Sequence, residues 1–162
     1  MAGGIHPSVF AQAAFLRNTY AGEARALRLR TVGFWRSHDG FGVTSSGDWD
    51  HVLGKTLLLR WGTIGTVSEV LRGLDWRSEL VLYQNLERTR AMAYEVFVRG
   101  VTRTTALTEY GGRLIYRQSV LRSWFYLDSL LGYSWLRLNP GEPLQGTTSV
   151  GLGSEIWFGP GT

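Results

Sequence analysis

The chain has 162 residues, no cysteine and a formal net charge of +4. The lack of cysteine excludes a disulfide framework, a thiolate metal site and a cysteine nucleophile. The basic residues alternate with carboxylates instead of forming a run, which argues against nucleic-acid binding, and no stretch of about 18 apolar residues is present, which rules out a helical membrane span.

Residues 1–26 are predicted to form a short N-terminal helix or linker. Ser8 is a favourable N-cap, and the apolar residues from Val9 to Tyr20 approximate a helical stripe that ends near Gly22. The alternative is a disordered remnant of an upstream region. The first seven residues lack the basic and apolar regions of a signal peptide. We therefore expect either a mature or truncated form of an exported protein, or a soluble protein.

Residues 27–159 are predicted to form one all-β domain of eight strands. Successive strand side chains point to opposite faces of a sheet, so a strand with one solvated face alternates between apolar and polar residues. In segment 74–86 the even positions carry no charge, whereas the odd positions include Asp75, Arg77 and Glu79. The expected strands are the segments 27–36, 41–49, 53–64, 74–86, 91–101, 107–120, 123–136 and 147–158.

A few residues break this alternation. Lys55 falls on the apolar side of its segment, where its long stem would let the charge reach water near a strand end. Several apolar residues fall on the charged side, namely Phe97, Ile115, Trp124, Tyr126, Leu130 and Trp157.

The last segment resembles the C-terminal assembly signal of bacterial outer-membrane β-barrels. Gly153, Ile156 and Phe158 match its pattern, whereas Gly151 stands at a position that is usually polar and residues 159–162 extend beyond the usual end. With eight alternating segments before it, the chain resembles the class of small outer-membrane barrels that includes OmpA, OmpX and the lipid A-modifying enzymes. The resemblance implies a closed antiparallel eight-stranded transmembrane β-barrel in the bacterial outer membrane. Its implied partners are membrane lipid, the barrel assembly machinery and an envelope protein.

Such a barrel would hold the charged residues in its lumen. A bilayer offers no partners to backbone polar groups, so a sheet spans it only when closed. Unpaired buried charges are costly, so arginines and carboxylates are expected to pair in one network. The expected members are Arg77, Glu79, Glu95, Arg99, Glu109, Arg113, Arg117, Asp128 and Glu155, with Arg28, Arg30, Arg60 and Asp75 as further candidates.

No catalytic, cofactor or metal residues are predicted. Ser37, His38 and Asp39 contain the residue types of a catalytic triad, but adjacent residues rarely converge in the required geometry, and a turn through Asp39 explains them. Asp48, Asp50 and His51 contain metal-ligand types. They fall where a short solvated periplasmic turn is expected.

The expected function is therefore a non-enzymatic structural element, anchor or subunit of an envelope assembly, with a lumen filled by side chains and closed to solutes. One alternative is a lipid A-modifying outer-membrane enzyme. The other is a soluble lipocalin-like barrel, in which the same sheet is turned inside out to bind a small apolar ligand.

Overall fold

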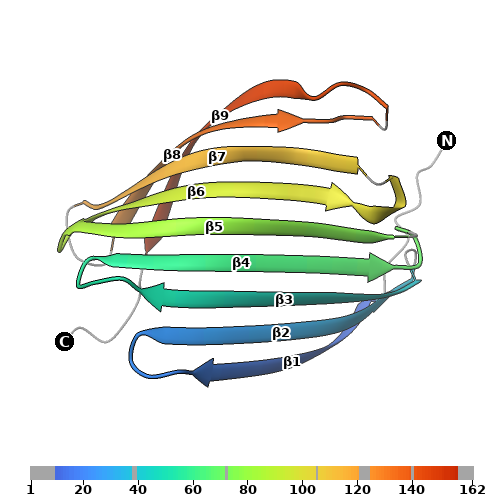
Figure 1. Cartoon of the computed structure of the whole chain (residues 1–162), viewed down its shortest axis with the longest axis horizontal. Helices are drawn as coiled ribbons and strands as arrows, with labels where there is room; N and C mark the ends of the chain where they lie inside the picture. The colour runs from blue at the N-terminus through green and yellow to red at the C-terminus, as the bar shows by residue number, and fades with distance from the viewer. Residues whose placement is uncertain are drawn as a thin grey trace, which may run out of the picture.

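The computed structural model describes residues 10–37, 40–71, 73–104, 106–120, 125–139 and 141–156. These residues form one antiparallel sheet of nine strands, in which each strand pairs with its neighbours in sequence (Figure 1). The strands are β1 (Phe10–Tyr20), β2 (Arg25–Arg36), β3 (Gly40–Val52), β4 (Leu57–Ser68), β5 (Leu74–Glu87), β6 (Arg90–Val101), β7 (Ala106–Ser119), β8 (Phe125–Leu136) and β9 (Gln145–Ile156). A single 3-10 turn, η1 (Thr102–Thr104), precedes β7, and no helix in the described ranges is long and apolar enough to cross a membrane.

The all-β prediction is confirmed, and the eight expected strands correspond to β2 to β9. The boundaries of β3 and β4 differ most from those predicted from the sequence. Asp48, Asp50 and His51 lie inside β3 and not in a turn, so the expected turn at that point was wrong. The turn instead contains Lys55, which lies outside the strands and so needs no place on the apolar face.

The predicted N-terminal helix is wrong, because Phe10–Tyr20 forms strand β1. The apolar residues of this segment are compatible with either periodicity, so local sequence did not decide between helix and strand. Pairing with β2 decides it, through a ladder that runs from Phe10 opposite Arg36 to Tyr20 opposite Ala26. The tight connection uses Gly22, whose φ of 71° favours glycine.

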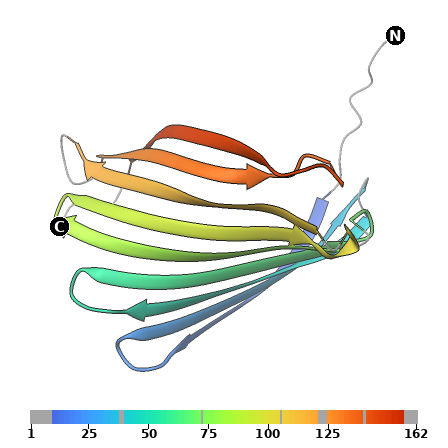
Figure 2. The ribbon, with the colours of Figure 1, turned by 45° about the horizontal axis from the view of Figure 1, so that its top comes forward.

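The sheet is strongly curved but is not closed by hydrogen bonds, so the closed eight-stranded barrel is not present in this structure (Figure 2). The expected ladder between residues 147–158 and 27–36 is absent among the described residues, because β1 occupies that edge of β2. β1 and β9 are the two edge strands of the sheet.

Cross-strand pairing aligns the alternating residues of all nine strands into two faces. One row runs from Arg28 through Asp48 and Gly62 to Glu79 and Phe97. We call the face that holds this row the charged face. The opposite face, which includes Leu80 and Val96, is the apolar face, and Arg17 is its only Asp, Glu, Lys or Arg residue away from the strand ends described.

The charged face is the inner side of the curve. Glu95 on this face is 9% exposed, whereas Val96, the next residue on the apolar face, is 58% exposed. The three most buried apolar side chains described, Val81, Ala93 and Phe97, also lie on the charged face. The sheet therefore encloses most of its charges together with a few apolar side chains, and leaves most of its large apolar side chains outside.

Candidate functional site: the charged face

The centre of the charged face is Glu95, the most buried charged residue described. Arg77 donates a hydrogen bond of 2.6 Å to Oε1 of Glu95, and Arg113 approaches the same oxygen at 3.6 Å from β7. Arg77 also donates to Glu79 at 2.9 Å. The ring of Phe97 lies beside both guanidinium groups, at 4.6 and 4.7 Å from its centroid. Two carboxylates, two arginines and one aromatic ring thus form a compact, internally satisfied cluster.

A second group lies on β2 to β5. Asp50 accepts hydrogen bonds from Arg28 at 2.6 Å and from Nε of Arg60 at 2.7 Å. Arg60 also lies 5.2 Å from the centroid of the Tyr83 ring. One carboxylate therefore links arginines from two strands, and the ring of Tyr83 shields Arg60.

A third group joins the last three strands. Arg117 of β7 binds both oxygens of Asp128 at 2.8 Å, and its Nη2 also donates to Glu155 of β9 at 2.7 Å. The ring of Tyr126 lies 5.6 Å from the guanidinium. This fork fits the planar geometry of arginine, and a lysine would satisfy only part of it.

A fourth pair is formed by Arg99 and Asp75, with hydrogen bonds of 3.1 and 2.7 Å. The structure thus brings eight of the nine expected lumen residues into ion pairs, but in separate groups and not in one network. Glu109 lies opposite Arg99 on β7 and forms no ion pair among the described residues. Arg30, a further candidate for the network, also forms no ion pair among the described residues.

The charges of this face balance. The strand pairing places equal numbers of arginines and carboxylates on it. The arginines are Arg28, Arg30, Arg36, Arg60, Arg77, Arg99, Arg113 and Arg117, and the carboxylates are those of Asp48, Asp50, Asp75, Glu79, Glu95, Glu109, Asp128 and Glu155. A face with this balance has no strong net field with which to attract an anionic or a cationic substrate.

Two residues that looked like exceptions in the sequence belong to the site. Arginines lie against the rings of Phe97 and Tyr126, and this contact explains why these two aromatic residues occur on the charged face. Asp50 was also missed as an ion-pair partner, since it was assigned to a turn. Its even position, shared with the charged residues of β2 and β4, was the signal that could have placed it on this face.

The residues that were expected to form an assembly signal lie on β9 as far as the structure describes them. Gly153 pairs with Asp128 on the charged face, and Ile156 ends the strand on the apolar face. Phe158 lies outside the described residues.

No metal centre is assembled in the described ranges. His38 and Asp39 lie outside them, so the geometry of the Ser37 segment is not defined. Asp50 is engaged by arginines and His51 stacks on Trp49 at 5.4 Å. No group of three metal-ligating side chains is present among these residues.

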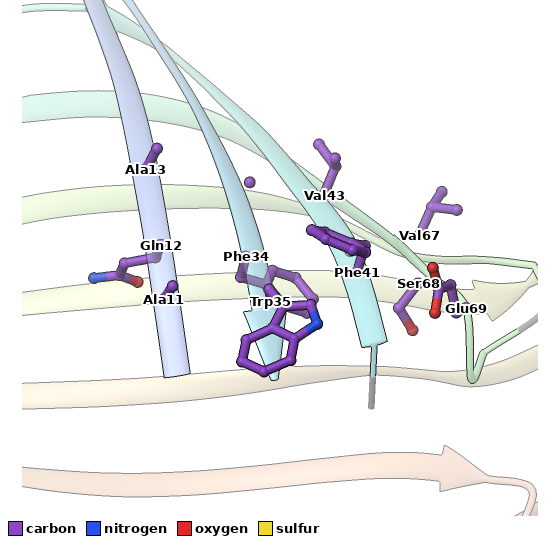
Figure 3. A pocket seen from close by; sticks show the side chains of 12 residues that line it. Ala11, Gln12, Ala13, Phe34, Trp35, Phe41, Val43, Val67, Ser68 and Glu69 are labelled. Carbon is purple, nitrogen blue, oxygen red and sulfur yellow. The ribbon is translucent and has the colours of Figure 1, made fainter. Parts of the chain in front are cut away.

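A hollow of about 790 Å³ lies at one end of β1 to β4. Figure 3 shows Ala11 and Ala13 of β1, Trp35 of β2, and Phe41 and Val43 of β3 around it. These five residues belong to the apolar face, whereas Gln12 and Phe34, which also line the hollow, belong to the charged face. No protein-family model and no curated protein matches this chain.

Proposed function

We propose that this chain is a non-enzymatic β-barrel of the bacterial outer membrane, which serves as a structural element, an anchor or a subunit of an envelope assembly. Membrane lipid, the barrel assembly machinery and an envelope protein are its proposed partners. The apolar face would contact lipid, and the charged face would fill the lumen.

The contrast between the two faces carries the proposal. The four ion-pair groups described above lie on the inner side of the curve, whereas the outer side exposes large apolar side chains such as Trp61, Leu131 and Val150. Exposing such an apolar surface to water is unfavourable, whereas exposing it to lipid is not. Strands of 11 to 14 residues are also long enough to span a bilayer when tilted.

The same contrast argues against the soluble lipocalin-like alternative. A lipocalin-like binder needs an apolar interior for its ligand and a polar exterior for water. Here the inner face contains Glu95 and Arg77, joined by a hydrogen bond of 2.6 Å from Nη2 of Arg77 to Oε1 of Glu95, and the outer face contains Val96. The candidate catalytic residues of the lipid A-modifying alternative, His38 and Asp39, lie outside the described residues.

In this proposal β2 to β9 close into an eight-stranded barrel, since a bilayer does not tolerate free sheet edges. An eight-stranded barrel has an interior just wide enough for side chains. The clusters around Glu95 and Arg117 would occupy it, so the protein would not conduct solutes.

Flotation with lipid vesicles tests the proposal. Urea-unfolded protein is diluted into phosphatidylcholine vesicles or into buffer without lipid, and each sample is centrifuged through a density gradient. We expect the protein to float with vesicles, to resist extraction by alkaline carbonate, and to precipitate without lipid or detergent. A monodisperse, folded protein in lipid-free buffer that stays at the bottom of the gradient would contradict the membrane assignment.

A further inference from the structure

The charges outside the charged face are shared unevenly between the two ends of the sheet. The connections after β1, β3 and β5 lie at one end, on the left of Figure 1, and we call it the basic end. Outside the charged face, the described residues of this end and of the strand segments beside it include five cations, Arg17, Arg25, Lys55, Arg88 and Arg90, and two carboxylates, Glu23 and Glu87. The described connections of the opposite end contain two of each, namely Arg103, Arg137, Glu69 and Glu142.

The cations of the basic end are mostly without protein partners. Arg25, Lys55 and Arg88 are exposed and form no ion pair among the residues that the structure describes. Arg90 approaches Glu87 only at 3.9 Å, with side chains that are 47% and 61% exposed. The closest ion pairs of the charged face measure 2.6 Å. The basic end therefore presents guanidinium and ammonium donors that the chain itself does not use.

Three of these cations lie on the apolar face. Arg25 begins β2 opposite His51, Arg90 begins β6 opposite Gln118, and Arg17 lies on the same face three residues before the end of β1. An arginine near the end of a membrane-spanning strand can place its charge among the headgroups while its stem stays among the acyl chains. The apolar face thus gains cationic donors where it approaches the basic end.

Aromatic side chains lie at the same level of the apolar face. The ring of Trp49 stacks on that of His51 with 5.4 Å between centroids, and Trp49 is opposite Trp61, which is 53% exposed. Arg25 lies beside this group, because it is opposite His51. Tryptophan is enriched at membrane–water interfaces, where its amphipathic ring suits the headgroup level. This aromatic group therefore supports a position of Arg25 among headgroups.

We propose that the basic end binds the phosphate of anionic phospholipids, with Arg25 and Arg90 of the apolar face and Lys55 and Arg88 of the connections as donors. The planar fork of arginine matches two phosphate oxygens in a charge-assisted pair. A free phosphate ester has the same group, but two of the four donors lie on the apolar face, which favours a ligand that also has acyl chains. This inference rests on the proposed function and deepens it, because it names the class of lipid and the residues that hold its headgroup.

Matched variants at the two ends of the sheet test the inference. Arg25→Gln removes one exposed cation from the basic end, and Arg103→Gln removes one exposed cation from the opposite end. Both variants change the net charge equally, and neither residue forms an ion pair in the described part of the chain. Arg25→Gln/Arg88→Gln is the stronger form of the test. Each variant is first floated with phosphatidylcholine vesicles, which reports insertion in the absence of anionic lipid.

Lipid binding is then measured by native mass spectrometry of protein in detergent micelles at low ionic strength. Phosphatidylglycerol, phosphatidylcholine or glycerol phosphate is titrated, and we expect the parent chain to bind phosphatidylglycerol several-fold more tightly than phosphatidylcholine. Arg25→Gln should weaken binding of phosphatidylglycerol about fivefold, as for one cation near an anionic lipid surface, and Arg103→Gln should weaken it by less than about twofold. The double variant should bind the two lipids equally.

Equal binding of the two lipids by the parent chain overturns the inference, and so do equal losses in Arg25→Gln and Arg103→Gln. Glycerol phosphate that binds as tightly as phosphatidylglycerol would also overturn it, and would indicate a site for a free phosphate ester. Flotation is scored separately. A parent chain that floats without preferring phosphatidylglycerol leaves the membrane assignment intact and removes only this inference, whereas a parent chain that does not float contradicts the membrane assignment itself.

Discussion

Arg77 and Arg99 lie directly opposite each other on β5 and β6, yet their guanidinium groups bind carboxylates in opposite directions along the strands. Arg77 reaches Glu79 and Glu95, whereas Arg99 reaches Asp75. Like charges directly across a ladder are destabilising unless each is compensated. The arrangement explains why two arginines can share this site, and why each depends on its own carboxylate.

Glu95→Gln should be strongly destabilising, because it leaves Arg77 and Arg113 without their shared carboxylate. The expected loss of unfolding free energy lies somewhat below the roughly 3–5 kcal/mol of a fully buried pair. Arg77 retains 26% exposure of its side chain, which allows some solvation. Urea unfolding in detergent micelles measures the change.

The double variant Glu95→Gln/Arg77→Gln is the control for this effect. It removes a matched pair and leaves Glu79 and Arg113 to balance each other, so it should be less destabilising than Glu95→Gln alone. Additive losses in the double variant would show that the charges are solvated separately.

Leu131→Arg should be destabilising by about 2–4 kcal/mol if the middle of β8 contacts lipid. Leu131 is 56% exposed on the apolar face, so the same change would be nearly neutral in a water-soluble protein. Leu138→Arg is the matched control, since Leu138 is also more than half exposed but lies in the connection between β8 and β9. Equal, small effects of both changes on refolding into vesicles would count against the membrane assignment.

Gly111→Ala should be destabilising by about 1–3 kcal/mol through overpacking. A Cβ at Gly111 would lie 2.5 Å from the Tyr133 carbonyl oxygen and 2.6 Å from Cβ of Ser134, where the backbone must shift to make room. At Gly33 a Cβ would meet nothing within 4 Å, so Gly33→Ala is the control and should change stability little. Unfolding midpoints of the two variants, compared with the parent chain, test the difference.

Phe158→Ala should reduce insertion in cells more than it reduces the stability of protein already folded in detergent, because the terminal signal would act during assembly. The readout is the amount of protein in the outer-membrane fraction, beside the unfolding midpoint of purified protein. Trp157→Ala, one residue away and of opposite parity, is the control. Membrane levels equal to those of the parent chain would remove the support that the terminal motif gives.

The sequence was sufficient to predict β2 to β9, because eight segments alternate strictly enough to define both faces. It was not sufficient for β1. Phe10–Tyr20 contains three alanines and apolar residues at both helical and strand spacing, and pairing with the edge of β2 decided its conformation. Long-range pairing of this kind leaves no local signal.

The ion pairs were harder to predict than the strands. Parity assigns Arg77, Glu95 and Arg113 to one face, but it does not show which carboxylate each arginine reaches. Arg77 is opposite Arg99 by register, and its long side chain passes this neighbour to reach Glu95. The grouping therefore depends on side-chain length and direction, which alternation alone does not contain.

The balance of arginines and carboxylates on the charged face determines how the molecule responds to salt. Because that face is neutral overall, the net charge of +4 must come from residues outside it, such as Arg25, Lys55 and Arg103. Charges exposed at turns are screened over a Debye length of about 10 Å at 0.1 M salt, whereas ion pairs in direct contact are screened much less. Retention on a cation exchanger should therefore fall steeply as salt is added, while the unfolding midpoint of the protein changes little.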